Sequence, residues 1–538
     1  MKHSKLEVGI YAVLISMFFY YLFVASNLFL MSHDAFLYLN NAKLLLGDAS
    51  VGFAATSQPL LSVIAAPFIL IFDSVNAFTA IKFVMVILSF LFLYVSWLFF
   101  RKQFDKEMAT LGVFLVSLNI VFIHFVPAIL PDILSGLVIT VTLLAYLHAR
   151  KSSHFLWYGI TSFFILLSFM AKLPNGAIVL IIILFEVFEK NWKMLTSKRF
   201  WIMLLLPFVV YYVIFSAAYT LFYGVDQNSI VGVFKSVFGL IMLNRGTELT
   251  QTLYNVEYQD PAFEYLFELY LGTSFLIMIL AFMGLILLCK NWNKHDKLTL
   301  AWILGFVIPY LFVHRESRYM FVFFPAFYYL VIKGLTFIKA YLNKFDSRKA
   351  KSFWYIFLIV LFAIPAYNAF AQITTYANDP VYFDDFPVRV SDYAYSEAKG
   401  KSVYFVGNGY NIQPERFTFT DYDETMFLYL IGETQLIYFS GKELPTYEPS
   451  NKVVYTNKGV QLENPLQGVA KSMAVLTKKE VVNPLQDGDI LILAESDGNF
   501  YTHNIPDNFE QDLFVYKVHI DDNQEASLEL LRIFSVYT

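Results

Sequence analysis

The sequence contains little charge and almost no cysteine. Only 15% of its 538 residues are Asp, Glu, Lys or Arg, whereas 57% are apolar and 19% are aromatic. This composition excludes an ordinary soluble enzyme and is typical of a polytopic membrane protein. The single Cys289 excludes an intramolecular disulfide framework and a multi-cysteine metal site. No Asn-x-Ser/Thr sequence occurs, which weakly disfavours a glycosylated eukaryotic protein.

The apolar residues form long continuous runs without a polar residue at every second position. This pattern indicates transmembrane helices and not a transmembrane β-barrel. The first run has no small-residue cleavage site behind it and is too long for a signal peptide, so we expect a retained first helix. The hydropathy predicts about eleven spans: residues 8–31, 77–100, 108–126, 133–149, 155–171, 175–189, 200–223, 265–289, 298–313, 319–338 and 353–372.

The connections between these spans alternate in charge. One set holds 19 Lys or Arg residues and the other set holds six. The positive-inside rule therefore places the amino terminus in the cytoplasm and the long carboxy-terminal tail outside, across the plasma membrane if the protein is prokaryotic. The assignment requires the apolar stretch 59–72 not to span. We predict it, with residues 34–46, as a pair of outer interfacial helices.

The composition changes near residue 372. Residues 1–372 carry 27 Lys or Arg against 18 Asp or Glu, and the remainder carries 12 against 25. We therefore predict a membrane domain over 1–372 and a soluble extracytoplasmic α/β domain over 373–538. Its candidate strands are 402–406, 435–439, 452–455, 489–494, 514–520 and 528–534, and its candidate helices are 388–398 and 424–431.

Two aspartates on the predicted outer face are candidates for chemistry. Asp34 opens the first interfacial stretch directly after the first span, next to His33, and a partly buried carboxylate there could serve as a general base toward a hydroxyl. Asp132 follows Pro131 in a short apolar turn that leaves little other reason for a carboxylate. The alternative for both is a helix N-cap, because Asp satisfies free backbone N–H groups there.

A cluster of ionisable residues, 314–319, lies between two predicted spans. Charges beside hydrocarbon are costly unless they are paired or face water. His314 and Arg318 could hold a phosphate, with Glu316 orienting Arg318. The alternative is interfacial anchoring by arginine and tyrosine, which leaves His314 and Glu316 unexplained. The few other outward cations, among them Lys172 and Arg245, suit an anionic ligand.

Two segments resemble motifs of the GT-C glycosyltransferases, membrane enzymes that take sugars from polyprenyl-phosphate carriers. The turn His314-Arg315-Glu316-Ser317-Arg318-Tyr319, followed by Pro325, resembles the His-Lys-Glu-x-Arg-Phe turn of lipid-linked mannosyltransferases. The outer loop after the first span resembles that of aminoarabinose transferases and protein O-mannosyltransferases, and the residues that carry this likeness are Asp34-x3-Tyr38-x3-Ala42, Gly47-Asp48 and Gln58-Pro59-Leu60. The predicted spans and outward tail match the family in layout.

The resemblance implies a GT-C fold and the transfer of a sugar from a dolichyl or undecaprenyl phosphate to an acceptor hydroxyl, with inversion. Asp34 would deprotonate the acceptor, and Asp132 would orient the acceptor or a cation. The groups expected to bind the donor phosphate are His314, Glu316, Arg318, Lys172 and Arg245; His33 and Tyr38 belong to the same first loop as Asp34. The expected partners are the carrier-linked sugar, membrane lipids and an acceptor protein, lipid or glycan, and no nucleic acid.

One residue departs from the family pattern. Many relatives follow the first-loop aspartate with a glutamate, whereas this chain has Ala35. A divalent metal is therefore an open question and no cofactor is assigned. Two other classes stay as alternatives, a transporter or flippase for a lipid-linked anion and a non-catalytic membrane assembly subunit. Transporters tend to place ionisable groups near the membrane midplane, where this sequence has none.

Overall fold

The computed structural model describes most of the membrane helices and part of the carboxy-terminal region. The residues described are 5–27, 33–47, 53–54, 58–72, 74–152, 154–223, 273–290, 292–310, 317–345, 348–378, 386–399, 401, 403–406, 475–476, 487–495, 512–520 and 526–534. By compactness the chain divides into two units. The first comprises residues 1–27, 81–251 and 256–379, and the second comprises 28–80, 252–255 and 380–538. The predicted division at residue 372 stays a prediction.

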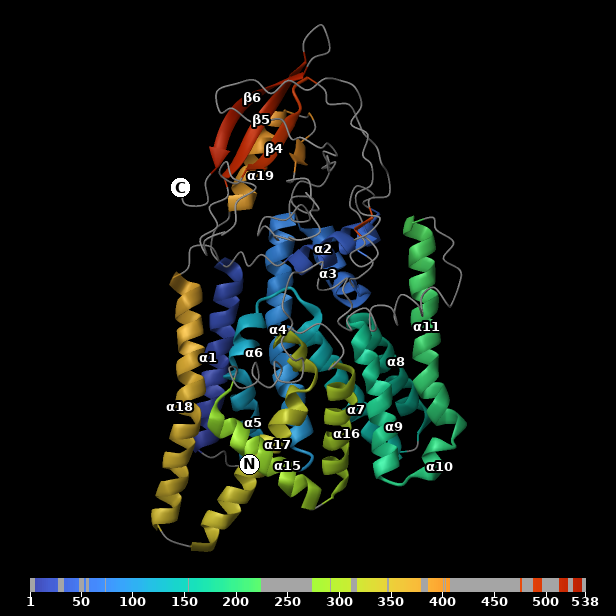
Figure 1. The fold of residues 1–538 in the computed structure, drawn as a ribbon, viewed down its shortest axis with the longest axis vertical. Helices are drawn as coiled ribbons and strands as arrows, with labels where there is room; N and C mark the ends of the chain where they lie inside the picture. Colours follow the sequence, from blue (N-terminus) through green and yellow to red (C-terminus); the bar gives the residue numbers. More distant parts are fainter. Residues whose placement is uncertain are drawn as a thin grey trace, which may run out of the picture. The chain divides into compact units, whose positions relative to one another are not determined.

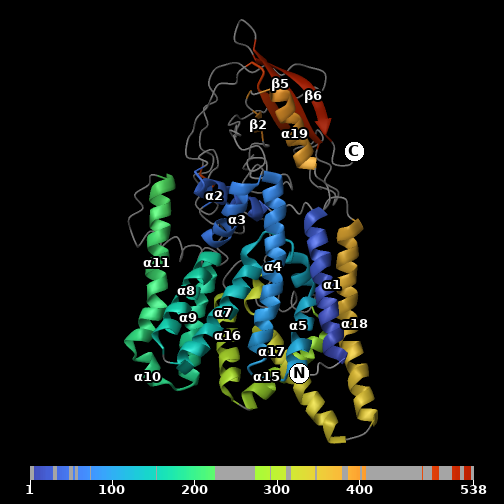
Figure 2. The same ribbon diagram turned by 180° about the vertical axis from the view of Figure 1, so that it is seen from behind.

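The first unit is a bundle of apolar helices (Figures 1 and 2). The predicted spans are helical over most of their described residues, although not all of them are continuous. The elements are α1 (Lys5–Asn27), α4 (Ser74–Phe100, which begins in the second unit), α5 (Lys106–Ser117), α6 (Ile120–Phe125), α7 (Pro131–Ser152), α8 (Phe155–Ala171), η1 (Leu173–Gly176), α9 (Ala177–Phe188), α10 (Trp192–Leu195), α11 (Lys198–Tyr223), α15 (Phe275–Lys290), α16 (Lys294–Tyr310), η2 (Ser317–Val322), α17 (Phe324–Leu342), η3 (Asn343–Phe345) and α18 (Arg348–Asn378).

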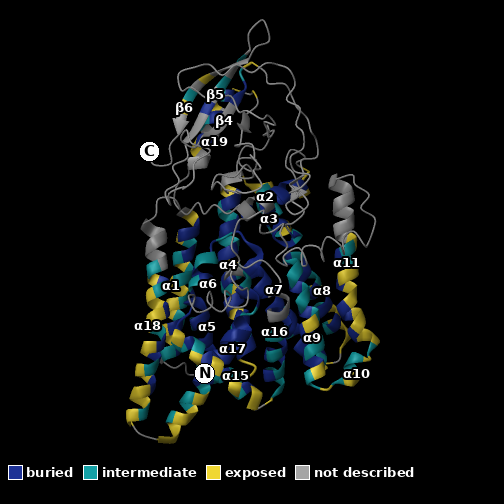
Figure 3. Cartoon of the chain, viewed as in Figure 1, coloured by how far each residue is buried: buried dark blue, intermediate teal, exposed yellow. Residues whose placement is uncertain are grey.

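Several of these helices have the length and composition of membrane spans. Four segments in the described part of the chain are long and apolar enough to cross a membrane: Leu6–Ser26, Asn76–Phe100, Pro131–Ser152 and Arg348–Ala371. Shorter apolar helices accompany them, such as Phe155–Ala171 and Phe275–Lys290. The outward faces of α11 and α18 expose apolar side chains, as expected for lipid contact (Figure 3). The chain is therefore a multi-pass integral membrane protein, and the count of eleven spans stays a prediction.

The predicted span 108–126 is divided into α5 and α6. Asn119 lies at the break, and its Oδ1 accepts the N–H of Val121 at 2.9 Å to cap α6. Its Nδ2 donates to the hydroxyl of Tyr328 on α17 at 3.1 Å, and both side chains are buried. A break inside a membrane needs such internal partners because lipid offers none. Hydropathy did not indicate this break because apolar residues surround Asn119 in the sequence.

Helices α15 and α17 approach each other through glycine. A Cβ atom built on Gly284 would lie 2.0 Å from the carbonyl oxygen of Leu330, and one on Gly334 would lie 2.5 Å from that of Leu280. Without these glycines the two backbones could not come this close. Small residues at a helix interface permit such packing between membrane helices.

An ionic network joins α7, α9 and α16 at the end of the bundle where α7 terminates. The carboxylate of Glu186 is fully buried, accepts a hydrogen bond from the Tyr146 hydroxyl at 2.6 Å, and forms an ion pair with Arg150, whose Nε lies 2.8 Å away. Glu189, just beyond α9, pairs with Arg150 at 3.1 Å and with Lys297 at 2.9 Å. Burial would raise the pKa of Glu189, but the hydrogen bond from Lys297 and the two cationic charges outweigh it and lower this pKa.

The second unit holds the two predicted interfacial helices and the described parts of the tail. The helices α2 (His33–Leu45) and α3 (Pro59–Ile71) contact each other. The short strand β1 (Phe53–Ala54) pairs with β3 (Val475–Leu476), a long-range pairing that the sequence did not indicate. That α2 and α3 lie in the membrane interface stays a prediction.

The tail contributes a mixed sheet with the strand order β2-β4-β5-β6. Its first pair of strands is parallel and the other pairs are antiparallel. The helix α19 (Phe386–Ala398) contacts strand β4. The strands are β2 (Val403–Val406), β4 (Ile490–Glu495), β5 (Asp512–Ile520) and β6 (Ala526–Phe534). The candidate strands 435–439 and 452–455 and the candidate helix 424–431 lie outside the described residues.

Candidate active site

Asp132 is held at the start of α7 by its local sequence. Pro131 is the first residue of the helix, where its fixed φ suits a helical start and its missing N–H costs nothing. Asp132 follows in the first turn, next to the positive end of the helix dipole. The residue is only 2% exposed. A carboxylate this deeply buried requires a compensating charge or hydrogen bonds.

Lys172 supplies that charge from the neighbouring helix. Helix α8 ends at Ala171 because Leu173 and Pro174 turn into the short η1 helix, and Lys172 has an extended backbone with φ −161° and ψ 132°. The Lys172 carbonyl accepts the N–H of Asn175 at 3.0 Å, which fixes the turn. The side chain then reaches Asp132, and Nζ lies 2.6 Å from Oδ1. The two residues are 40 positions apart in the sequence.

The ring of Tyr319 covers the same ammonium. Tyr319 lies in η2, and the Nζ of Lys172 is 3.5 Å from the centre of its ring. A cation within about 6 Å of an aromatic face is attracted by the negative face of the ring. We call Asp132, Lys172 and Tyr319 the lysine cluster. It joins the start of α7 and the junction of α8 with η1 to the 3-10 helix η2.

The remaining candidate residues are placed only in part. Asp34 and His33 are the first two residues of α2, where their backbone is described and their side chains are not, whereas Tyr38 on the same helix is buried. Arg318 lies in η2, again with only its backbone described. Arg245, His314 and Glu316 lie outside the described residues. Their proposed roles stay predictions.

The lysine cluster can bind and orient an anion but shows no sign of a metal site. Among the side chains that the structure describes, no group of three or more His, Cys, Asp or Glu residues is arranged to hold a metal ion. A lysine ammonium carries three N–H donors, and Lys172 donates one of them to Asp132. Such a group is suited to a phosphate oxygen.

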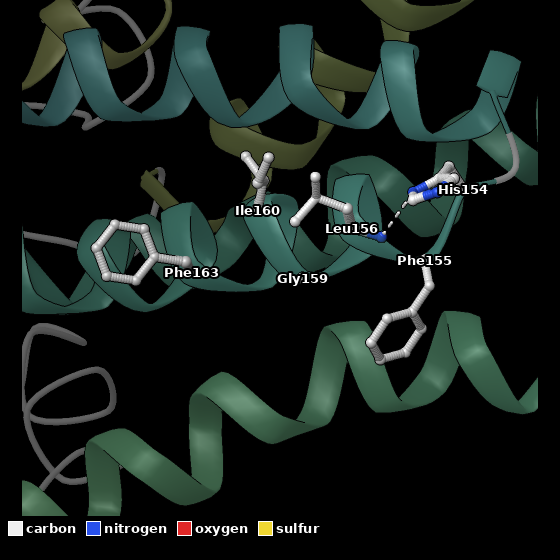
Figure 4. Close-up of a pocket in the computed structure, with 6 residues that line it drawn as sticks. All are labelled: His154, Phe155, Leu156, Gly159, Ile160 and Phe163. Atoms are coloured by element: carbon white, nitrogen blue, oxygen red, sulfur yellow. Dashed lines mark hydrogen bonds between the residues drawn. The ribbon is translucent and has the colours of Figure 1, made fainter.

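A hollow of about 410 Å³ lies elsewhere, at the other end of α8 (Figure 4). His154, at its edge, accepts the N–H of Leu156 on Nδ1. Phe163, the lining residue farthest along α8, lies nine residues before Lys172, or about 14 Å at 1.5 Å per residue. Its almost wholly apolar lining is unsuited to a sugar phosphate, so we do not count it in the site. It is lined by His154, Phe155, Leu156, Gly159, Ile160 and Phe163.

Solved structures share this fold at low sequence identity. The oligosaccharyltransferase of Archaeoglobus fulgidus in its apo form matches with a TM-score of 0.51 and 12% identity, over 78% of this chain and 64% of that chain. ArnT from Cupriavidus metallidurans matches with a TM-score of 0.54 and 12% identity, over 81% of this chain and 86% of that chain, both in the apo state and bound to undecaprenyl phosphate. This chain therefore spans less than two thirds of the archaeal enzyme.

These likenesses define the class of the protein: it has the GT-C fold, and the resemblance drawn from the two sequence motifs is confirmed. Within that class, residues 56–247 match the model of the family described as dolichyl-phosphate-mannose-protein mannosyltransferase. The matched segment contains both Asp132 and Lys172. No curated protein matches the chain.

Proposed function

We propose that the protein is a glycosyltransferase that moves a sugar from a polyprenyl phosphate carrier to an acceptor hydroxyl on the extracytoplasmic face of the membrane. The observation that carries the proposal is the lysine cluster in a GT-C bundle. Its charge pair joins the buried Asp132 to the half-buried Lys172, and both residues lie inside the segment 56–247 matched by a mannosyltransferase family model. Proteins of the same fold have been solved with dolichol-phosphate and with undecaprenyl phosphate bound. A phosphate ester of this class is the ligand that an anchored ammonium suits.

The reaction follows from the chemistry of a sugar phosphate. The acceptor oxygen forms a bond to the anomeric carbon and gives its proton to a carboxylate, which the resemblance assigns to Asp34. The bond from that carbon to the carrier phosphate breaks, and the phosphate leaves with the electron pair from the opposite face. The anomeric configuration is therefore inverted, through an oxocarbenium-like transition state by analogy with glycoside cleavage.

The leaving phosphate needs charge stabilisation more than protonation. Lys172 would supply part of this stabilisation, and the 2.6 Å contact with Asp132 holds its ammonium in position. Arg318, His314 and Arg245 are the further cations expected to act with it, and Glu316 would orient Arg318. Removing one preorganised donor of this kind typically costs about 10²–10³ in rate.

The experiment compares sugar donors and variants of the full chain in lipid nanodiscs. Purified protein is incubated with labelled polyprenyl-phosphate mannose, glucose or aminoarabinose and a mixture of hydroxyl acceptors, and release of free polyprenyl phosphate is followed. We expect release from one donor, reduced by roughly 10²-fold or more in Lys172→Gln. Lys151→Gln is the matched control, because Lys151 is exposed at the far end of α7.

Each other outcome counts against the proposal. Release that is equal in Lys172→Gln and in the control refutes the role of the lysine cluster. If every donor binds without being cleaved, the reconstituted protein is tested for movement of the lipid-linked sugar across the bilayer. Movement assigns a transporter or flippase, and its absence assigns a non-catalytic assembly subunit.

A further inference from the structure

We propose that Tyr319 is a positioning residue for Lys172. We propose also that Gly136, by allowing η2 to pack closely against α7, sets the position of the tyrosine ring relative to the ammonium. The inference rests on the proposed function, because it takes Lys172 to be the group that meets the donor phosphate. It assigns to Tyr319 a role other than anchoring at the membrane interface.

Asp132 and Tyr319 hold the ammonium of Lys172 by different chemistry. Asp132 accepts a hydrogen bond from it, and the centre of the Tyr319 ring lies 3.5 Å from Nζ. A lysine side chain has four rotatable bonds and loses considerable entropy when it is held in one place. An aromatic face attracts the charge without competing as an oxygen acceptor. It can therefore hold the ammonium near the site while hydrogen bonds are made to a phosphate.

The ring is carried by a turn whose place is set by α7. Gly136 lies one helical turn after Asp132, and a Cβ atom built there would come 2.7 Å from the carbonyl oxygen of Phe321 and 3.1 Å from its carbonyl carbon. Both are backbone atoms, so no side-chain rotation relieves the contact. Only glycine allows η2 to approach α7 this closely. Because Phe321 is two residues beyond Tyr319, any shift of this turn moves the ring relative to Lys172.

The turn is also held by contacts with α16, α4 and α6. The indole N–H of Trp302 on α16 donates to the carbonyl oxygen of Val322 at 2.8 Å, and Trp302 is fully buried. The ring of Phe321 is buried against Phe92 and Phe122 at centroid distances of 6.4 Å and 6.3 Å. The backbone of η2 thus contacts α7 at Gly136 and α16 at Trp302. A substitution at Gly136 must displace this turn or push α7 away from it.

The first test uses the tyrosine, since it leaves the helix contacts alone. Tyr319→Phe keeps the aromatic face, and Tyr319→Leu removes it. We expect Tyr319→Leu to weaken binding of polyprenyl phosphate by roughly 3- to 30-fold, the range for a cation on an aromatic ring. The same variant should raise the KM for the donor with a smaller change in kcat, and Tyr319→Phe should restore both. Tyr341→Leu is the matched control, on the far end of α17 with an exposed ring.

A double mutant separates positioning through Lys172 from a general packing effect. In the Lys172→Gln background, Tyr319→Leu should cause no further loss of phosphate binding, because the group it positions is gone. Gly136→Ala should raise the donor KM in the same direction, whereas Gly159→Ala, with nothing within 4 Å of its Cβ, should not. Thermal unfolding of each variant shows whether Gly136→Ala still folds. If Gly136→Ala does not fold, the comparison of Tyr319→Phe with Tyr319→Leu tests the positioning role by itself.

The outcomes distinguish this inference from the proposed function. If Lys172→Gln binds polyprenyl phosphate as the wild type does, Lys172 does not meet the donor phosphate, and the role that the proposed function gives to the lysine cluster is refuted. If Lys172→Gln weakens binding but Tyr319→Leu does not, the positioning role alone is overturned. It is also overturned if Tyr319→Phe is as defective as Tyr319→Leu, or if the effects of Lys172→Gln and Tyr319→Leu are additive.

Discussion

The close approach of α15 and α17 makes Gly284→Ala a sharp test of the packing. A Cβ at Gly284 would lie 2.0 Å from the Leu330 carbonyl oxygen and 2.6 Å from its carbon. Ordinary contacts of this type are at least about 3.4 Å, so the helices must separate by roughly 1 Å or more. Overpacking of this kind costs about 1–3 kcal/mol, occasionally more, while Gly→Ala in a helix returns up to about 1 kcal/mol. We expect a net loss of about 1–2 kcal/mol in the free energy of unfolding.

The measurement is denaturant unfolding in detergent micelles, followed by tryptophan fluorescence. The matched control is Gly159→Ala in α8, where a Cβ meets nothing within 4 Å. That variant should be unchanged or slightly more stable, because only the propensity term acts. If Gly284→Ala unfolds at the same denaturant concentration as Gly159→Ala, the backbone contact between α15 and α17 is wrong.

Three further predictions concern the base and the ionic network. Asp34→Asn should abolish turnover and leave carrier binding largely intact; near-normal turnover by radiolabelled sugar transfer would exclude Asp34 as the base. Glu186→Ala should lower the free energy of unfolding by roughly 3–5 kcal/mol, because the buried donors around this carboxylate lose their acceptor. Glu189 is more exposed, so a smaller loss for Glu186→Ala than for Glu189→Ala would contradict this prediction. Because the pKa of Glu189 is lowered in the folded protein, its ionised carboxylate stabilises the fold at pH values above the ordinary glutamate pKa of about 4.3. This stabilisation is lost as the pH falls through the lowered pKa. The difference in thermal midpoint between wild type and Glu189→Gln should therefore be largest at neutral pH and shrink below pH of about 4, and a constant difference would refute it.

The sequence predicted helices well where their ends carry local signals. Residues 155–171 were predicted as a span and form α8, because His154 caps its first turn and Pro174 prevents its continuation. The break at Asn119 was missed because one of the two partners of its amide, Tyr328, is far away in the sequence. A lone asparagine inside an apolar run was the available signal.

The sequence singled out Asp132 and Lys172 as candidates but did not indicate the contact between them. Asp132 and Lys172 were both singled out, but their pairing depends on how α7 packs against α8, which no local pattern encodes. Tyr319 was interpreted as a possible anchor, and its place over Lys172 follows from the approach of η2 to Gly136. Gly136 itself carries no chemistry, so only the packed structure shows its importance.

The hydrogen bond between Asn119 and Tyr328 has a consequence for biogenesis. The cap from Asn119 to Val121 is local and can form as soon as that segment leaves the ribosome. The Nδ2 group of the same amide can donate to the Tyr328 hydroxyl only after that residue, 209 positions later, has been synthesised. At about 5–20 residues per second this delay is roughly 10–40 s, during which the amide needs a substitute partner such as water or the translocation machinery. The nascent protein therefore carries an unfinished helix break in its membrane segment until α17 is inserted.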